Sequence, residues 1–232
     1  MTTTGAGRPR LSTRKRPGAT ARDEILDAAA ELFTTGGFTS TSTRMIADAV
    51  GIRQASLYHH FANKDDLLTA LLVGTVTSPL AFAQEMHESP EPAAVRMYAL
   101  AWFDAQQLAA SRWNLGALYL LPELRTERFE PFRAQRGTLM NLYTEFARDA
   151  LVQINPDRDV DLRTAQLPFR LVETVINTRS DAETEGTGIP TSPDVIADAS
   201  IRILGWIGST AELASRTTAL LDGYAGRLRE HL

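Results

Sequence analysis

Cysteine is absent from the 232 residues of this chain. Disulfide bonds, thiolate metal sites and thiol-based redox sensing are therefore excluded. Aromatic residues make up only 7% of the sequence, although its hydrophobic content of 44% is ample for a buried core. The N-terminal stretch has no apolar run typical of a signal peptide, and no segment reaches the ~18 apolar residues of a membrane span. We therefore expect a cytoplasmic protein that does not bind a membrane.

Motifs of common enzyme classes are also missing. The sequence contains no G-x-S-x-G, no glycine-rich phosphate loop and no H-E-x-x-H. His59 and His60 are adjacent, so on a helix their side chains point to different sides and do not share a metal ion. We expect no catalytic site, no metal site and no cofactor. An enzyme is the rival function, which turnover of any substrate would reveal.

The most informative stretch runs from residue 42 to residue 64. Apolar residues spaced for one helical face end at Val50, and Gly51 interrupts the pattern. Leu57 and Phe61 resume it at a spacing of four residues. This pattern predicts two short amphipathic helices joined by a tight turn, the arrangement of a helix-turn-helix. Gly51 is expected to adopt the positive φ of the turn.

The residues outside this apolar face are mostly hydrogen-bond donors and amphipathic rings, with no acid after Asp48. Such a surface is typical of proteins that contact nucleic acid. The alternative is an ordinary helical hairpin whose polar face is solvated. We predict a DNA-binding surface that comprises Thr43, Arg44, Arg53, Gln54, Ala55, Ser56, Tyr58, His59 and Lys64.

The same stretch resembles the signature of the TetR family of bacterial one-component transcriptional regulators. Residues 21–38 are similar to the first helix of that family, so the resemblance extends over about residues 20–68. The matching segments are Ile46–Ala47, Gly51–Ile52, Leu57–Phe61 and Asn63–Lys64.

The resemblance implies an all-α fold, with an N-terminal three-helix helix-turn-helix DNA-binding domain and a larger helical effector-binding and dimerisation domain. It implies a homodimeric repressor that a small apolar or amphipathic effector releases from a near-palindromic operator in double-stranded DNA. A DNA-binding or architectural dimer that senses no ligand is the alternative. Arg53 and Ala55 depart from the family pattern, which usually has Ser and Gly there. Losing this Ser removes a helix N-cap worth about 1 kcal/mol.

Charge is divided unevenly along the chain. Residues 1–64 carry nine basic and five acidic residues, whereas residues 65–232 carry 15 basic and 23 acidic residues. A phosphate-binding module joined to an acidic body would have this asymmetry. We predict a disordered basic arm over residues 1–19, the DNA-binding domain over 20–64 and the ligand-binding and dimerisation domain over 65–232.

The predicted arm contains proline, glycine and threonine but no acid, a composition typical of disordered segments. It either follows DNA phosphates and the minor groove or only keeps the protein soluble. Its basic residues are Arg8, Arg10, Arg14, Lys15 and Arg16.

Local signals divide the chain into helices. Thr20 and Asp23 form a capping-box pair at the start of the first helix, and Asn63 is expected to cap the fourth. We expect this fourth helix over residues 64–77, interrupted or kinked at Ser78–Pro79. Further helices are predicted near residues 91–111, 113–121, 131–154, 160–181, 194–207 and 210–230.

Aromatic residues gather in the middle of the chain with polar residues among them. Taken one by one, they fit ordinary core packing. The family resemblance implies an effector pocket in this domain, for which we choose Trp102, Phe103, Gln106, Trp113, Asn114, Tyr119, Phe146 and Phe169.

Two later stretches, residues 167–176 and 195–207, look apolar on more than one side. A helix that is apolar all round is buried on both sides, either inside one subunit or between two. The resemblance implies a two-fold dimer of late helices. The predicted interface residues are Leu171, Val175, Ile201 and Leu204.

Overall fold

A computed structural model describes residues 16–157, 161–186 and 192–230 of the protein. All regular elements within these ranges are helices, which confirms the predicted all-α fold class. The chain divides into two compact units, Met1–Leu68 and Thr69–Leu232. We call them unit 1 and unit 2 and describe each by itself. Arg8, Arg10, Arg14 and Lys15 of the predicted arm lie outside the described residues.

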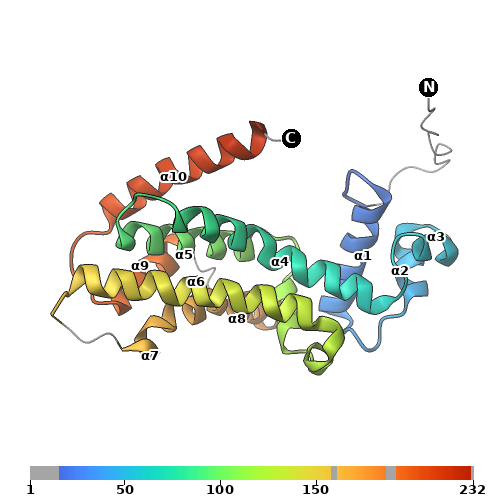
Figure 1. The fold of residues 1–232 in the computed structure, drawn as a ribbon. Coiled ribbons are helices and arrows are strands. Elements are labelled where there is room, and N and C mark those ends of the chain that lie inside the picture. The colour runs from blue at the N-terminus through green and yellow to red at the C-terminus, as the bar shows by residue number, and fades with distance from the viewer. Residues whose placement is uncertain (1–15, 158–160, 187–191, 231–232) are drawn as a thin grey trace. The chain divides into compact units, whose positions relative to one another are not determined.

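Unit 1 contains α1 (Ala21–Thr35), α2 (Thr43–Val50), α3 (Gln54–Tyr58) and the first turn of α4 (Lys64–His87), drawn in blue to cyan in Figure 1. The Thr20 hydroxyl accepts a hydrogen bond from the Asp23 backbone N–H, and the Asp23 carboxylate accepts one from the Thr20 backbone N–H. This reciprocal pair confirms the predicted capping box. It fixes the start of α1 by satisfying two N–H groups that the helix leaves free.

The tight turn between α2 and α3 has the predicted geometry. Gly51 adopts φ 78°, ψ 35°, a left-handed conformation that a side chain would strain. Its N–H and that of Ile52 donate to the Ala47 carbonyl, which closes the end of α2. Leu57 of α3 is fully buried with Ile46 of α2, so one apolar face holds the two helices together.

Helix α4 begins where expected, because the Asn63 side chain accepts a hydrogen bond from the Asp66 N–H at 2.9 Å. The predicted interruption at Ser78–Pro79 is wrong, since α4 runs without a break to His87. A proline inside a helix costs about 3 kcal/mol. The buried residues beyond it, Phe82, Ala83 and Met86, outweigh this cost by extending the apolar face of the helix.

The same helix is long and apolar enough, by composition alone, to cross a membrane. Its most apolar 18-residue window has a mean hydropathy of 1.5, and 44% of that window is buried in the protein. Core helices of soluble proteins meet this criterion too, and α4 starts at the helix-turn-helix. We treat it as a core helix.

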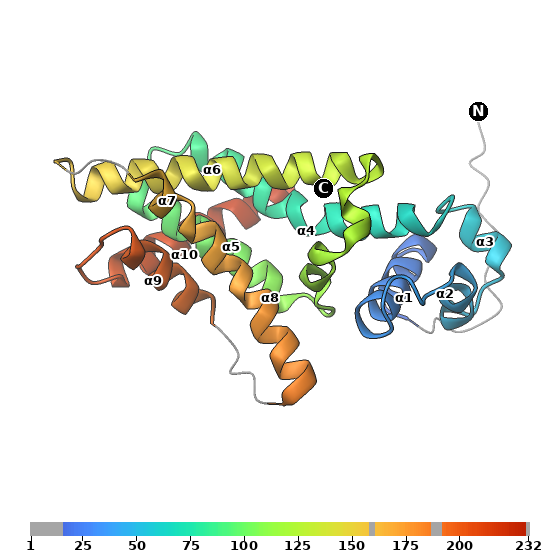
Figure 2. The same cartoon turned by 90° about the horizontal axis from the view of Figure 1, so that it is seen from below.

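Unit 2 is built around α5 (Ala93–Ala110). This helix packs against the four long helices α6 (Glu130–Ile154), α8 (Leu167–Glu185), α9 (Pro193–Ile203) and α10 (Ala211–Glu230). Figures 1 and 2 show these helices around α5 in two views. The centre of α5 is apolar on almost every side, with residues Met97 to Ala101 at 1% exposure or less.

Two segments differ from the expected helices. Residues 113–121, predicted as an α-helix, belong to a series of short 3₁₀ helices: η1 (Leu115–Leu120), η2 (Pro122–Arg125) and η3 (Glu127–Phe129). The predicted helix over 160–181 is divided at Gln166 into α7 (Leu162–Ala165) and α8. Pro168 lies in the first turn of α8, where its missing N–H costs nothing.

Candidate nucleic-acid interface

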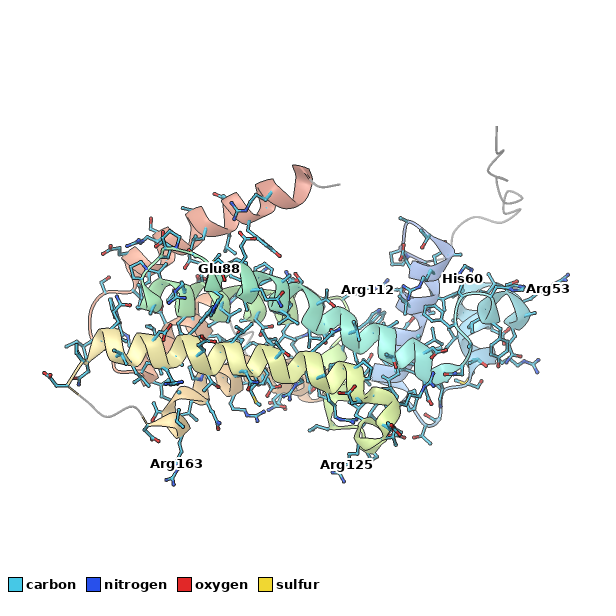
Figure 3. All side chains as sticks on the ribbon, viewed as in Figure 1. Arg53, His60, Glu88, Arg112, Arg125 and Arg163 are labelled. Carbon is cyan, nitrogen blue, oxygen red and sulfur yellow. The ribbon has the colours of Figure 1, made fainter. Side chains whose placement is uncertain are left out.

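Helices α2 and α3 present a polar surface opposite their shared apolar face. Because Ile46 and Leu57 are buried, the residues on the other side of each helix are turned outward. Arg44 has a side-chain exposure of 81%, and Tyr58 of α3 is exposed although it is a large aromatic residue. Arg53 extends away from the ribbon where α3 begins (Figure 3). Gln54, Ala55 and His59 are exposed as well.

Three hydroxyl and amide groups connect α2 and α3 on this surface. The Thr43 and Tyr58 hydroxyls lie 3.0 Å apart, and Gln54 Nε2 donates to Thr43 Oγ1 at 2.9 Å and to the Tyr58 hydroxyl at 3.4 Å. We call these residues the Thr43–Gln54–Tyr58 network. It fixes the Gln54 carboxamide and leaves the exposed oxygen Oε1 as an acceptor outside the network. A side chain held in this way loses less conformational entropy when it binds a partner.

The start of α3 lacks the cap that the family pattern usually has. Arg53 occupies the N-cap position and makes no capping hydrogen bond with its side chain. This outcome agrees with the expected loss of an N-cap. The only neighbouring acid on α2, Asp48, lies 4.0 Å from the Arg44 guanidinium, and both side chains are largely exposed. Such a pair is weak, so the Arg44 side chain can exchange it for another anion.

Lys64, which we predicted to belong to the DNA-binding surface, is bound to backbone groups of its own unit. Its ammonium group donates to the backbone carbonyls of Phe38 at 2.8 Å, Thr41 at 3.1 Å and Thr39 at 3.5 Å. It also lies 4.2 Å from the centroid of the Phe38 ring. Three N–H donors therefore face the loop between α1 and α2. Ser56 of α3 is half-buried.

Arg16, the one basic residue of the predicted arm that the structure describes, is bound to protein groups. Its guanidinium forms ion pairs with Asp27 at 2.9 Å and Glu31 at 2.5 Å, and its Nε donates to the Ala49 carbonyl. The pairing with two acids raises the pKa of Arg16 against the opposing effect of its burial. We conclude that Arg16 fastens the start of the described chain to α1 and α2. It is not available to follow phosphates.

The eight residues predicted to line one effector pocket do not converge in unit 2. Trp102 Nε1 donates to Asp194 at 2.8 Å, and Asn114 Nδ2 donates to the Ile176 carbonyl and the Ser180 hydroxyl. Phe103 stacks on Phe82, Phe146 is fully buried beside His87 and Arg96, Trp113 contacts Arg112, and Gln106 is half-buried. The contacts of these six residues fit core packing, whereas Tyr119 and Phe169 line one cavity.

That cavity is small and polar. It has a volume of about 10 Å³, roughly the space of one water molecule. Besides Tyr119 and Phe169 it is lined by Thr75, Val76, Asp104, Leu108, Arg136, Leu139 and Glu173. We call it the Asp104 cavity.

Asp104 is the chemically unusual residue of this cavity. It is 5% exposed, and its carboxyl group lies 3.0 Å from the Tyr143 hydroxyl. Burial raises the pKa of Asp104 to about 7, and the negative charge of Glu173 acts in the same direction, against the hydrogen bond from Tyr143 and the charge of Arg136. Burial, with the nearby carboxylates, also raises the pKa of Tyr119 to about 12. Sequence reasoning missed Asp104, although it is the only acid of α5.

A larger recess lies elsewhere in unit 2. It has a volume of about 530 Å³ and is lined by the end of α6 and the α9–α10 connection, including Ile154, Leu204 and Trp206. Ile207, beside it, is 96% exposed. Among the residues that the structure describes, no group of three or more His, Asp or Glu side chains could hold a metal ion.

Three of the four predicted dimer residues face the interior of their own subunit. Val175, Ile201 and Leu204 have exposures of 2% or less and belong to the core of unit 2, which contradicts their prediction as interface residues. Leu171 is half-buried. The large apolar side chains exposed on α9 are Val195 and Ile203, about two helical turns apart on one face, and the charged residues Asp194 and Arg202 are exposed as well.

Known proteins resemble this chain in sequence and in structure. The sequence profile described as "Bacterial regulatory proteins, tetR family" matches residues 25–71. The crystal structure of AmtR from Mycobacterium smegmatis superimposes with a TM-score of 0.83. It is 54% identical in sequence, over 90% of this chain and 98% of that chain. The chain belongs to the TetR family.

Other TetR-family relatives match less of the chain. The HTH-type transcriptional repressor KstR2 of Rhodococcus jostii is 49% identical over 53 residues, which are 23% of this chain and 26% of KstR2. The match therefore spans only about a quarter of this curated relative. A TetR-family transcriptional regulator from Bordetella parapertussis has a TM-score of 0.63 at 24% identity, covering 81% of this chain and 95% of its own, and shares the fold.

Proposed function

We propose that the protein is a homodimeric transcriptional repressor that binds a near-palindromic operator and is released by a small-molecule effector. The observation that carries the proposal is the exposed polar surface of α2 and α3, held by the Thr43–Gln54–Tyr58 network. Membership of the TetR family and the similarity to KstR2, a transcriptional repressor, support the repressor role. A protein with this task acts in the cytoplasm, where the DNA is.

The roles of the surface residues follow from their chemistry. Arg44 is highly exposed, and a guanidinium suits the two acceptors of guanine in the major groove. Gln54 keeps its Oε1 acceptor outward, and a carboxamide suits adenine. Thr43, Ser56 and Tyr58 carry hydroxyl groups that suit phosphate oxygens. Arg53 adds a positive charge, and Ala55 and His59 complete the surface that α3 offers to DNA.

The dimer is proposed to form through the exposed faces of α8 and α9, which pack against each other in unit 2. Val195 is 59% exposed and Ile203 40% exposed, and the half-buried Ala199 lies between them on the same face. Leu167 and the half-buried Leu171 extend this apolar surface onto α8. A dimer carries two copies of α3, one for each half-site of a near-palindromic operator.

Footprinting on the DNA that flanks the protein's own coding region tests the proposal. Protection of a near-palindromic site is expected, with the dimer as the bound species. Arg44→Ala should weaken binding to this site by about 1–3 kcal/mol and relax the preference at one base pair. Arg163→Ala is the matched control, because Arg163 is an exposed arginine of unit 2 (Figure 3). Equal losses of specific and non-specific affinity in Arg44→Ala would contradict the base-reading role.

The sensing half of the proposal has its own test. A ligand that binds only the folded protein raises its thermal stability by mass action. An effector must in addition have different affinities for the DNA-bound and free forms. A broad screen in which ligands raise the melting temperature but never change operator affinity would favour the dimer that senses no ligand.

A further inference from the structure

The Asp104 cavity gathers charged and polar groups from five elements of unit 2. Asp104 belongs to α5, Arg136 to α6 and Glu173 to α8, and Tyr143 of α6 contacts Asp104 without lining the cavity. Tyr119 of η1 and Thr75 of α4 complete its polar wall. They lie within the apolar core of unit 2. Polar side chains inside a protein cost free energy unless each has a partner.

Most of the charges in this wall already have partners. The Glu173 carboxylate pairs with Arg136 through one oxygen and with Arg170 at 2.9 Å through the other. Arg136 also lies over the rings of Tyr119 and Phe169. Asp104 is the exception, because its hydrogen-bond partner, the Tyr143 hydroxyl, is uncharged. When ionised, Asp104 is therefore a buried anion that no cation pairs directly.

The hydrogen bonds around Asp104 are better satisfied when it carries a proton. The Tyr143 hydroxyl lies 3.0 Å from the Asp104 carboxyl and 3.3 Å from the Leu100 carbonyl, and it has one hydrogen to donate. A protonated Asp104 donates to Tyr143, which is then free to donate to Leu100. An ionised Asp104 and the Leu100 carbonyl compete for that single hydrogen. A positively charged group in the cavity would remove this competition by pairing with the carboxylate.

Two tyrosines lie near these carboxylates, Tyr119 in the wall and Tyr143 hydrogen-bonded to Asp104. Burial raises the pKa of both hydroxyls, the negative charges of Asp104 and Glu173 act in the same direction, and Arg136 opposes the shift at Tyr119. A negative potential in a buried space favours a cation. The aromatic faces of Tyr119 and Phe169 act in the same direction, because the ring quadrupole attracts positive charge.

Arg136 adds a second requirement. Its Nε atom is buried and has no hydrogen-bond partner among the described residues. A ligand that carries both a positive charge and a neighbouring acceptor atom would satisfy both residues: the charge would pair with Asp104, and the acceptor would take the hydrogen bond of Arg136 Nε. A hydroxyl or ether oxygen beside a protonated amine has this chemistry.

We infer that the Asp104 cavity is the effector site and that it binds a small protonated amine with a neighbouring acceptor oxygen. The ammonium group pairs with Asp104, and the oxygen accepts from Arg136. The regulatory meaning of this inference rests on the proposed function, because it takes the bound amine to be the effector.

The cavity must open before it can hold such a molecule, and we expect the Tyr119 side chain of η1 to move. The Thr75 hydroxyl donates to the Leu72 carbonyl at 2.6 Å, so the Tyr119 hydroxyl, also at 2.6 Å, is the donor in the bond to Thr75. Leu118 is 4% exposed and holds η1 against the core, whereas Tyr119 is half-buried and Leu120 is exposed. A ligand that displaces the Tyr119 hydroxyl therefore breaks one hydrogen bond to α4, the helix that begins at Lys64 in unit 1.

Thermal unfolding of the full chain with 2-aminoethanol hydrochloride in the millimolar range tests the inference. Sodium chloride at the same ionic strength and neutral ethylene glycol are the reference solutes. The amine should raise the melting temperature of the unchanged protein and of Glu212→Gln, which alters an exposed acid of α10. It should not raise that of Asp104→Asn. Circular dichroism and operator binding show whether Asp104→Asn is folded.

Two further measurements do not depend on that variant. Because the pKa of Asp104 is raised to about 7, the apparent association constant of the amine at pH 6 should be about a tenth of that at pH 8. Operator affinity should fall as the amine saturates the protein.

Three results would overturn the inference: no Asp104-dependent shift, a shift with the same size at both pH values, or binding that leaves operator affinity unchanged. If the operator is bound and the amine has no effect, the effector site is wrong and the DNA-binding function stands. If the amine binds through Asp104 and no operator is found, the proposed function fails instead.

Discussion

Replacing Lys64 by Ala distinguishes a lysine that holds the helix-turn-helix together from one that contacts phosphate. Its ammonium group donates to the Phe38 carbonyl at 2.8 Å and the Thr41 carbonyl at 3.1 Å, and it lies 4.2 Å from the Phe38 ring centroid. A hydrogen bond to a charged group contributes about 1.5–3 kcal/mol, and a cation–π contact at an exposed site about 0.5–1 kcal/mol. Lys64 is half-buried, so hydrogen bonds to water in the unfolded state offset part of this free energy. We expect unit 1 to lose about 2–3 kcal/mol of stability.

The assay must report on unit 1 alone. Tryptophan fluorescence does not, because Trp102, Trp113 and Trp206 all belong to unit 2. Amide hydrogen exchange of the α2 segment, followed by mass spectrometry, measures local opening directly. Since about 1.4 kcal/mol is a tenfold change in an equilibrium constant, exchange there should accelerate roughly 30- to 150-fold. Exchange of the α5 segment in unit 2 should not change.

Arg53→Ala is the matched control, because Arg53 is an exposed cation of the same unit without a capping hydrogen bond. It should leave exchange unchanged and reduce the salt dependence of operator binding by about 0.9 in the log–log slope if Arg53 contacts a phosphate. The structural role of Lys64 is refuted if the amide hydrogens of the α2 segment exchange at the same rate in Lys64→Ala as in the unchanged protein and the substitution lowers only the salt dependence of operator binding.

Further substitutions separate the other roles. Arg53→Ser restores a side-chain N-cap, so the stability of unit 1 should rise by about 0.5–1 kcal/mol while operator affinity falls; urea melts followed by circular dichroism and gel-shift titrations measure the two effects. Ile203→Glu, on the exposed face of α9, should give folded monomers in analytical ultracentrifugation, whereas Val175→Glu, in the core, should give unfolded or insoluble protein; a monomer from Val175→Glu would contradict this assignment. Burial raises the folded-state pKa of Asp104 from its ordinary value of 3.8 to about 7, so the folded state binds the proton more tightly than the unfolded state. The stability that this proton contributes is lost as pH rises from about 4 to about 7. Asp104→Asn should therefore gain stability relative to the unchanged protein across that range, by at most about 1.4 kcal/mol per pH unit; a constant difference between the two urea midpoints would refute the raised pKa.

The helix-turn-helix could be predicted because its signals are local. A capping box depends on residues three apart, and the positive φ of Gly51 follows from a turn between two apolar runs. Both were found as expected. The roles of Lys64 and Arg16 could not be predicted in this way. Their partners lie in other elements, 23 to 26 residues away for Lys64 and up to 33 residues away for Arg16.

Unit 2 was harder to predict for a related reason. The apolar pattern of residues 167–176 and 195–207 indicated two buried sides but not which side faces its own subunit. The structure buries Val175 and Ile201 inside and leaves Val195 and Ile203 outside. Likewise, an aromatic residue in a sequence does not show whether it lines a cavity or fills a core. A single acid such as Asp104 within an apolar helix was the stronger signal.

The proline inside α4 makes one turn of this helix more compliant than the rest. Pro79 has no N–H, so it cannot donate to the carbonyl of Thr75 four residues earlier. Gly74 weakens the same part of the helix, because it has no side chain to restrict the backbone and no neighbour lies within 4 Å of the position where a Cβ would be. Bending is concentrated where a helix has lost a hydrogen bond. Breaking the hydrogen bond between Tyr119 and Thr75 therefore acts on the most compliant turn of α4, the helix whose first turn contains Lys64.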